Sequence, residues 1–354
     1  MLVTRQPVLR RFWYPVVPLS ALDDGPQAFT LLGEKIVLWR DGDGAPVALE
    51  DRCCHRTTQL SKGWVEDGCI VCGYHGWTYD RTGKCVRIPQ RREPESRSGF
   101  RVRSFRTAER YGYVWVALDE PLADVPEFPE AADPDYRKID QFYEVWHCAG
   151  LRLMENSFDN AHVHFVHRKT FGVIKEPVPP KLTIEENDQG FVMRADLKVF
   201  NSELQKKNLK DDAEFTTRHV TSTWYKPFAR KLHIRYPNGL VHAIVTVATP
   251  IDDASSQIVQ FAFRNDSEAE APAADIVAFD RQVTAEDRDI LESTEYDVPL
   301  DPQSGYEFHM VSDKPGLVMR RQLQELFAAH GETEATDRAA PDRSTEAARA
   351  SAAE

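Results

Sequence analysis

Several features that place a chain in a common class are missing from these 354 residues. No apolar run approaches the roughly 18 residues that a membrane-spanning helix needs. The apolar stretch 12–22 contains Pro15 and Pro18 and no small-residue cleavage site follows it, so we do not expect a secretory signal. The sequence has no glycine-rich nucleotide-binding fingerprint and no long basic stripe. With a formal net charge of -12, it predicts neither a membrane nor a nucleic acid as partner.

Cysteine is scarce, and its placement is uneven. Four of the six cysteines lie in one short segment together with two histidines: Cys53, Cys54, His55, Cys69, Cys72 and His75. Mixed Cys and His clustering in a chain without a secretory signal indicates metal binding rather than disulfides. We therefore expect a reducing, cytoplasmic location.

Residues 31–120 have the pattern of a small all-β domain. Residues 31–39 are mostly apolar or β-branched and precede a turn with two glycines, residues 76–88 resemble a hairpin, and residues 111–118 form another strand pattern. The first domain is therefore expected at residues 1–120.

A stretch rich in Pro, Asp and Glu at residues 121–135 is the best linker candidate. The patterns beyond it predict a helix at 150–168, strands between about 181 and 263, and a helix at 275–293. A second domain of sheet plus helices is expected at residues 121–330. Residues 331–354 can bury no core of their own and are expected to form a disordered tail.

The first candidate site consists of two short arms, Cys53-x-His55 and Cys72-x-x-His75, separated by the 16 residues 56–71. Each arm offers one thiolate and one imidazole. A [2Fe–2S] cluster with two sulfur ligands on one iron and two imidazoles on the other needs this set. Zinc is the competing metal, because a Cys₂His₂ set also suits a tetrahedral structural site. The remaining cysteines are expected to be small buried apolar residues: Cys54, Cys69, Cys85 and Cys148.

The second candidate site lies in residues 155–167. Asn156, Asp159 and His162 recur at spacing three and would share one face of a helix. His164 and His167 follow, and helix geometry alone does not select which two histidines form a pair. Two imidazoles and one carboxylate with open positions form the iron site of non-haem Fe(II) oxygenases. The carboxylate must come from far downstream, where the acidic candidates are Asp280, Glu286, Asp287, Asp289 and Glu292.

In this order the two motifs resemble those of the Rieske non-haem iron oxygenases. The Cys/His arms, with Gly76-Trp77 after the second arm, are similar to the Rieske signature of that family. The later segment Asn156-x-x-Asp159-x-x-His162-x₄-His167 is similar to the motif that follows the Rieske domain. The resemblance covers about residues 8–328. The segments 12–16 and 312–316 point to the branch that contains vanillate, dicamba and methylxanthine demethylases and alkaloid hydroxylases.

This resemblance implies a role for each motif residue. Cys53 and Cys72 would bind one iron of the cluster, and His55 and His75 the other. A mononuclear Fe(II) would be bound by His162, His167 and Asp287, the last in a segment similar to the family's acidic helix. Asp159 would bridge the two metal centres across a subunit boundary, and Asn156 would lie near the metal.

The resemblance also implies a fold and an activity. The fold would be α+β, an all-β Rieske domain followed by a catalytic antiparallel sheet with helices of the helix-grip type. The chain would use O₂, and electrons from a separate reductase or ferredoxin, to hydroxylate or oxidatively demethylate a small aromatic, heterocyclic or alkaloid-like substrate. It would act as a homotrimer. The alternatives are a cis-dihydroxylating dioxygenase and a Rieske electron carrier without oxygenase chemistry.

Overall fold

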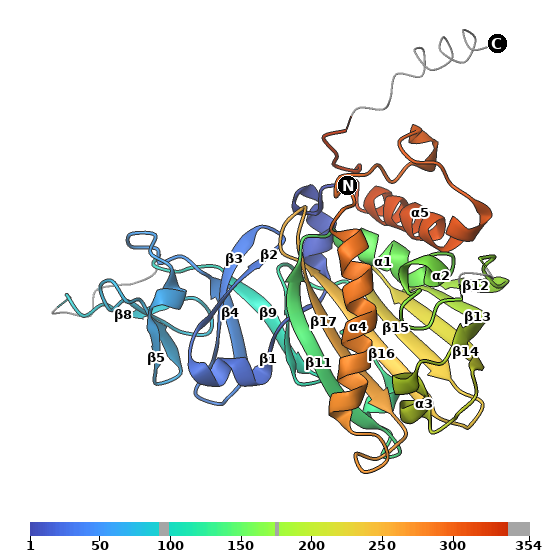
Figure 1. Cartoon of the computed structure of the whole chain (residues 1–354). Helices are drawn as coiled ribbons and strands as arrows, with labels where there is room; N and C mark the ends of the chain where they lie inside the picture. The colour runs from blue at the N-terminus through green and yellow to red at the C-terminus, as the bar shows by residue number, and fades with distance from the viewer. Residues whose placement is uncertain (92–98, 174–176, 339–354) are drawn as a thin grey trace, which may run out of the picture.

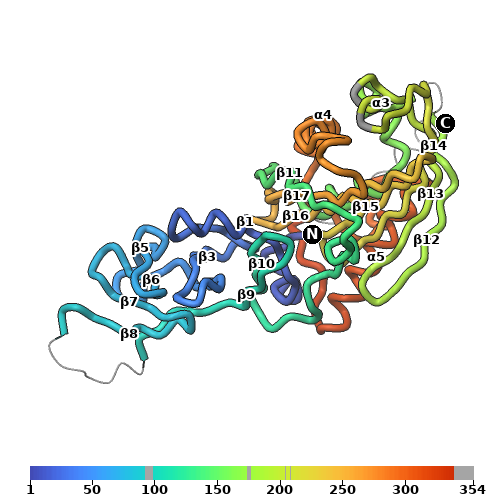
Figure 2. The backbone as a smooth tube through the Cα atoms, turned by 90° about the horizontal axis from the view of Figure 1, so that it is seen from below, coloured from blue at the N-terminus to red at the C-terminus, as the bar shows by residue number. Residues whose placement is uncertain are grey.

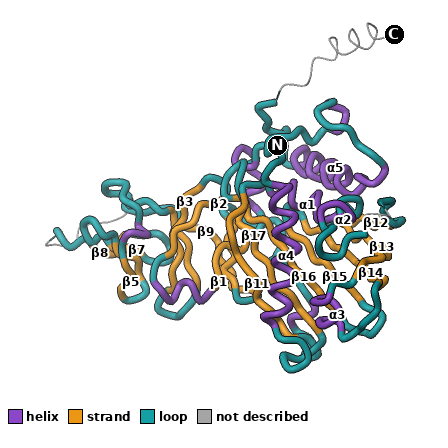
Figure 3. The backbone as a smooth tube through the Cα atoms, in the orientation of Figure 1, coloured by secondary structure: helices purple, strands orange, loops and turns teal. Residues whose placement is uncertain are grey.

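The computed structural model describes residues 1–91, 99–173 and 177–338. Two sheet-based parts lie side by side along the molecule: an all-β part from the first third of the chain, and a large sheet accompanied by helices (Figures 1 and 3). The predicted α+β class, with an all-β domain followed by an antiparallel sheet with helices, is confirmed. Within these ranges, no helix has both the length and the apolar character needed to cross a membrane.

The all-β part contains two antiparallel sheets. The larger has the strand order β1-β10-β9-β4-β3-β2, and the smaller has the order β5-β6-β7-β8 and lies at the far end of the molecule (Figure 1). The hairpin expected at residues 76–88 is β7 and β8, in which Tyr79 pairs with Cys85. The strands are β1 Tyr14–Pro18, β2 Gln27–Leu31, β3 Glu34–Arg40, β4 Pro46–Glu50, β5 Trp64–Glu66, β6 Cys69–Val71, β7 Thr78–Tyr79, β8 Cys85–Arg87, β9 Ser104–Arg110 and β10 Tyr113–Ala117.

The second part is built on a seven-stranded antiparallel sheet of order β11-β17-β16-β15-β14-β13-β12. In β14, every second residue from Thr216 to Trp224 is buried, so one face of this strand points into the protein. All nine residues of β17 are buried, as expected for a strand that is covered on both faces. The strands are β11 Arg137–Trp146, β12 Leu182–Asn187, β13 Gly190–Phe200, β14 Phe215–Tyr225, β15 Ala229–Arg235, β16 Val241–Pro250 and β17 Ser256–Arg264.

The helices confirm one expectation and correct another. The helix predicted at residues 275–293 is α4, which runs along the sheet beside β11 and buries Ile276 and Phe279 (Figure 1). The continuous helix predicted at 150–168 is wrong, because the chain leaves helical geometry at Asp159. The helices are α1 Gly150–Phe158, α2 Val163–Val166, α3 Glu203–Leu209, α4 Ala273–Leu291 and α5 Lys314–Ala329. Short 3-10 segments are Val3–Arg5, Pro7–Arg11, Leu19–Asp24, Leu60–Lys62, Pro129–Ala131, Pro302–Ser304 and Val311–Asp313.

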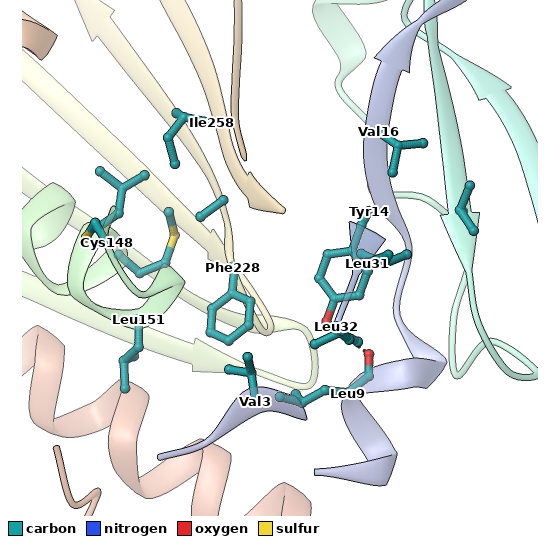
Figure 4. Packing of buried hydrophobic residues seen from close by; sticks show 14 of the residues in the cluster. Val3, Leu9, Tyr14, Val16, Leu31, Leu32, Cys148, Leu151, Phe228 and Ile258 are labelled. Atoms are coloured by element: carbon teal, nitrogen blue, oxygen red, sulfur yellow. Dashed lines mark hydrogen bonds between the residues drawn. The ribbon is translucent and has the colours of Figure 1, made fainter. Parts of the chain in front are cut away.

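A continuous hydrophobic core joins the two parts. In Figure 4, Tyr14 and Leu32 from the first part lie opposite Phe228 from the second, and all three side chains are buried. A backbone hydrogen bond also crosses the contact between the two parts, which we call the seam: the Leu32 N–H donates to the Pro250 carbonyl over 2.9 Å. The seam therefore fixes how the two parts are oriented. The domain boundary near residue 120 stays a prediction.

The segment after α5 corrects part of the predicted tail. Residues 331–338 are described, and they hydrogen-bond to the first residues of the chain. The Leu2 N–H donates to the Ala335 carbonyl over 2.7 Å, and the Val8 N–H donates to Glu332 over 2.8 Å. These polar residues are ordered by backbone pairing rather than by apolar burial, so composition gave no signal. The rest of the predicted tail, residues 339–354, lies outside the described residues.

We expect the Arg320→Met variant to unfold about 2–4 kcal/mol more easily than the wild type in a denaturant titration. Arg320 of α5 is buried and donates to Glu155 of α1 over 2.5 Å and to Glu307 over 2.6 Å, so its loss leaves both carboxylates without this partner. The neighbouring Arg321 is 48% exposed and pairs with Glu325, so Arg321→Met should cost less than about 1 kcal/mol. Equal losses in the two variants would contradict this account.

Candidate metal centres

The Cys/His arms are two turns of the same design. The first follows β4, and the second joins β6 to β7. In each turn, the N–H of the residue four positions after the cysteine donates to the cysteine carbonyl over 2.9 Å: Thr57 to Cys53, and Gly76 to Cys72. Thr57 and Gly76 both have positive φ values, 58° and 71°. These residues therefore turn the chain back so that the side chains of both arms face each other.

The four donors of the arms face one another, and one of them has no partner. Cys53 and Cys72 are buried, and burial together with the Cys53 thiol raises the pKa of Cys72. The rings of His55 and His75 meet edge to face with centroids 4.6 Å apart. The buried Nδ1 of His55 has no hydrogen-bond partner in the described residues, as expected of an atom that is reserved for a metal.

The spacing of these donors does not suit a single ion. Donors of one tetrahedral zinc lie within about 4 Å of each other, because zinc bonds are about 2.0–2.3 Å long. Within the described part of the chain, the one group with three metal-binding atoms inside 4.8 Å of each other is elsewhere, and no three donors of the two arms form such a group. A two-iron cluster, which spreads its ligands over two metals, fits the wider set.

Two aromatic residues contact the arms; Trp77 belongs to the motif already described, and Tyr79 was missed. The Tyr79 hydroxyl lies 3.0 Å from the Cys53 sulfur and 3.3 Å from the Cys54 sulfur, and burial raises its pKa, so it remains a donor. The Trp77 ring stacks on His55 with centroids 4.5 Å apart. Hydrogen bonds to cluster sulfurs tune the reduction potential. The signal available in the sequence was the position of both residues directly after the second arm.

The second site begins where α1 ends. Asp159 has extended backbone angles, and its carboxylate accepts the backbone N–H of Ala161 over 2.6 Å and that of His162 over 3.3 Å. This local turn restarts the helix as α2, with His162 before its first residue and His167 after its last. Asn156, Asp159 and His162 therefore do not share the face of one helix.

The histidine pair that the motif favoured meets a carboxylate from α4. The Nε2 atoms of His162 and His167 lie 3.3 Å apart, and Oδ1 of Asp287 lies 3.5 Å from the first and 3.3 Å from the second. A point roughly 2 Å from all three atoms lies inside this triangle, which is the length of a metal bond to nitrogen or oxygen. His164 lies outside it, because its Nδ1 accepts the Val173 N–H over 3.0 Å.

Neighbouring polar groups orient the triangle. Glu286 lies 3.0 Å from the outer nitrogen of His167 and accepts the Thr170 hydroxyl over 2.8 Å. Asn156 donates to Asp287 over 3.1 Å. Burial opposes the charged form of His167, but Asp287 and Glu286 outweigh it and raise the pKa of this histidine. Burial likewise opposes the charge of Asp287, and His167 and Asn156 nevertheless hold its pKa below the usual value. Glu286, one of the competing carboxylates, thus acts through His167.

A cavity of about 140 Å³ opens beside the triangle between α2, α4 and the sheet. Three large aromatic residues of the neighbouring strands are not among the lining residues, because Trp224 and Phe228 belong to the core and Tyr225 faces a different groove. The strand residues of the lining are Leu197, Arg218, Val220, Ser222, Arg230, Leu232, Ile234, Ile244, Thr246 and Gln260.

Comparison with known proteins identifies both halves. The model of the Rieske [2Fe-2S] domain matches residues 12–106, and that of the vanillate O-demethylase oxygenase C-terminal domain matches residues 146–329. The chain belongs to the Rieske non-haem iron oxygenases. It is 30% identical to methylxanthine N1-demethylase NdmA of Pseudomonas putida over 334 residues, which are 92% of this chain and 91% of the relative.

Solved structures of Rieske oxygenases agree over the whole length. The structure of Pseudomonas putida CBB5 NdmA with caffeine has a TM-score of 0.78 at 28% identity and covers 95% of this chain and 99% of its own. Dicamba monooxygenase bound to dicamba has a TM-score of 0.76 at 25% identity and covers 91% and 98%. This Rieske oxygenase is therefore an oxidoreductase that uses a [2Fe–2S] cluster, a mononuclear non-haem iron and O₂, as predicted.

We expect Cys72→Ser to abolish the visible absorption of the [2Fe–2S] cluster in the purified oxygenase, because a serine hydroxyl is a poor substitute for a thiolate ligand. Cys69→Ser is the matched control: it removes a thiol three residues away in the same segment, on β6, and should leave the spectrum unchanged. A red-brown Cys72→Ser protein with full iron content would show that the assignment of Cys72 is wrong.

Proposed function

We propose that the side chains of His162, His167 and Asp287 hold the mononuclear iron of this oxygenase. The observation that carries the proposal is the triangle of their three ligand atoms, with sides of 3.3–3.5 Å, inside the domain that matches the oxygenase family. Two imidazoles and one carboxylate on one face leave the opposite positions of an iron open.

The same proposal assigns the four donors of the two arms to the cluster. Cys53 and Cys72 bind one iron, and His55 and His75 bind the other, which leaves the histidine side nearer the surface. When bound, the cluster supplies single electrons and the mononuclear iron activates dioxygen. The protein's own part is to orient the ligands: Glu286 fixes His167, and Asn156 fixes Asp287.

We further propose that the reaction is hydroxylation of a methyl or ring carbon of a small aromatic or heterocyclic substrate. Hydroxylation of an O-methyl or N-methyl group is followed by loss of formaldehyde, which completes a demethylation. Methylxanthine demethylases and dicamba monooxygenase among the relatives support this assignment. Isotopically labelled O₂ separates it from cis-dihydroxylation, which places both oxygen atoms in the product.

Two features bear on the proposed partners: the lack of a nucleotide-binding motif in the sequence and the positions of the two sites in the fold. Its sequence has no nucleotide-binding fingerprint, so a separate reductase or ferredoxin supplies the electrons. The small sheet of the cluster arms lies at one end of the molecule (Figures 1 and 2), and helix α2 lies in the second part, beside β13 (Figure 1). We therefore propose that the two centres of one chain do not exchange electrons directly, and that the chain forms a homotrimer in the cytoplasm.

Exposed apolar residues mark where a second copy would bind. Asp159 lines an open cavity of about 360 Å³ together with Phe308, which is 92% exposed. Val311, close along the chain, is 94% exposed. At the other end of the molecule, Tyr74 is 63% exposed directly beside His75. Large exposed apolar side chains at both places are typical of an interface, and they support a contact between His75 of one copy and Asp159 of the next.

We expect His162→Ala to contain about two irons per chain instead of about three, and to lose formaldehyde production while keeping the visible spectrum of the cluster. His164→Asn is the control, because it keeps a side-chain acceptor for the Val173 N–H and should retain all the iron. Metal analysis and turnover with a reductase measure both effects. If the His164 variant lost iron and the His162 variant did not, the proposed pair of histidine ligands would be wrong.

Two variants of Asp159 separate its two roles. Asp159→Asn keeps an oxygen that accepts the backbone N–H groups of Ala161 and His162, whereas Asp159→Ala loses both the turn and the charge. If the carboxylate bridges the two centres, Asp159→Asn keeps its iron but passes electrons from the reduced cluster at least tenfold more slowly in single-turnover experiments. Asp159→Ala, which also loses the turn, should in addition hold the mononuclear iron less firmly. If the Asp159→Asn variant were fully active, Asp159 would have only a structural role in the local turn and would not bridge the two centres.

A further inference from the structure

The cavity beside the triangle is lined by two arginines that nothing in the reaction so far uses. Arg218 lies on β14 and is 5% exposed, and Arg230 lies on the neighbouring strand β15. Burial lowers the pKa of Arg230 to about 10, although the nearby Asp287 opposes this shift. The guanidinium group of Arg230 nevertheless carries a positive charge at neutral pH.

Arg218 has an unused hydrogen-bonding edge. Its Nε and Nη2 atoms are buried and have no hydrogen-bond partner among residues 1–91, 99–173 and 177–338, and the same holds for Nε of Arg230 and for the Ser222 hydroxyl. The Nε and Nη2 donors form one side of the planar guanidinium, and this side matches the two oxygens of a carboxylate.

Aromatic rings hold the Arg218 group in place without using that edge. The guanidinium carbon lies 4.9 Å from the centre of the Phe171 ring and 5.5 Å from that of Tyr236. A cation above a ring is stabilised through its face, so the in-plane N–H groups stay free. The Phe171 ring in turn stacks on His167 at 4.8 Å, so the Arg218 group and the proposed iron ligand lie on either side of one ring.

The acidic residues of the cavity are already engaged. Asp287 accepts from Asn156 over 3.1 Å, Asp159 accepts from the backbone of Ala161 over 2.6 Å, and Asp280 accepts from Gln141. An unpaired buried charge is costly, because it loses hydration and gains no partner. The rest of the wall near Arg218 is apolar, with Val220 and Leu232 on the two strands. This arrangement fits a ligand with an apolar ring and one negative group.

We propose that the substrate is a one-ring aromatic or heterocyclic acid whose carboxylate is bound by Arg218, with the carbon to be hydroxylated directed toward His162, His167 and Asp287. This inference rests on the proposed function and narrows its substrate class. Arg230 adds a second positive charge to the cavity. The cavity of about 140 Å³ holds a single ring, and the carboxylate end determines which way the ring enters.

Binding measurements test the proposal without turnover. Isothermal titration of the anaerobic, metal-replete oxygenase is carried out with paired probes that differ only in charge: 4-methoxybenzoate and 4-methoxybenzamide, and nicotinate and nicotinamide. We expect each carboxylate to bind more tightly than its amide. Arg218→Gln should weaken carboxylate binding by about tenfold to a hundredfold, the value of a charge-assisted hydrogen bond, and leave amide binding unchanged.

Two further variants keep the test decisive. Arg218→Lys retains the charge but not the planar edge, so its carboxylate affinity should lie between those of the wild type and Arg218→Gln. Arg194→Gln removes an arginine that is 48% exposed on the neighbouring strand β13 and should change nothing. Because Arg218→Gln also removes the ring contacts of the guanidinium, the amide probes serve as the control for the fold: their affinity should stay the same in this variant.

The outcomes separate this inference from the proposed function. A wild type that binds every amide as tightly as its carboxylate, or an Arg218→Gln variant with unchanged carboxylate affinity, overturns the inference even if the enzyme turns over other substrates. If His162→Ala keeps its iron and turnover while the carboxylate preference persists, the assignment of the iron ligands fails and the anion site stands.

Discussion

The candidate iron site depends on the chain leaving helical geometry on both sides of α2. His167 follows His162 by five positions, which on a continuous helix would place the two residues about 140° apart. The turn that Asp159 forms with the next backbone N–H groups ends α1, and the chain leaves α2 again at His167. Both imidazoles can then face Asp287 of α4, at distances of 3.3–3.5 Å. Asp159 therefore has a local structural role in addition to its proposed part in electron transfer.

The hydrophobic core shared by the two parts fixes their relative orientation, which is a second constraint on the two candidate metal sites. Tyr14 and Leu32 pack against Phe228 across the seam, and residues 331–338 tie the far end of the chain back to the first residues. Such a joint holds the small sheet with the cluster arms away from α2 in a fixed direction. In the proposed homotrimer another copy would bring its own cluster to the iron, and the exposed apolar residues near both sites would form the contact between the copies.

The cavity shows how polar groups are distributed around such a centre. Most buried polar atoms near the triangle are paired: Glu286 with His167, Asn156 with Asp287, and Gln141 with Asp280. Among the residues that line the cavity, Arg218, Arg230 and Ser222 instead have buried atoms without a hydrogen-bond partner in the described part of the chain, and Arg218 has two of them on one edge. Buried polar groups are normally satisfied within the fold, so an unsatisfied guanidinium at the end of an apolar wall indicates a group whose partner is the ligand.

The sequence by itself determined the elements whose signals are local. The cluster arms, the histidine motif and helix α4 were visible because ligand spacing and helical periodicity extend over a few neighbouring residues. Tyr79 and Arg218 were not recognised, and Glu286 was recognised only as a competing metal ligand, because their roles arise from contacts between segments that are distant in the chain or folded back on each other. Only the tertiary structure decided that His164 points away, that the predicted helix breaks at Asp159 and that residues 331–338 are ordered. Each of these depends on contacts with distant segments: the sheet and α4 for the two histidine sites, and the first residues of the chain for residues 331–338.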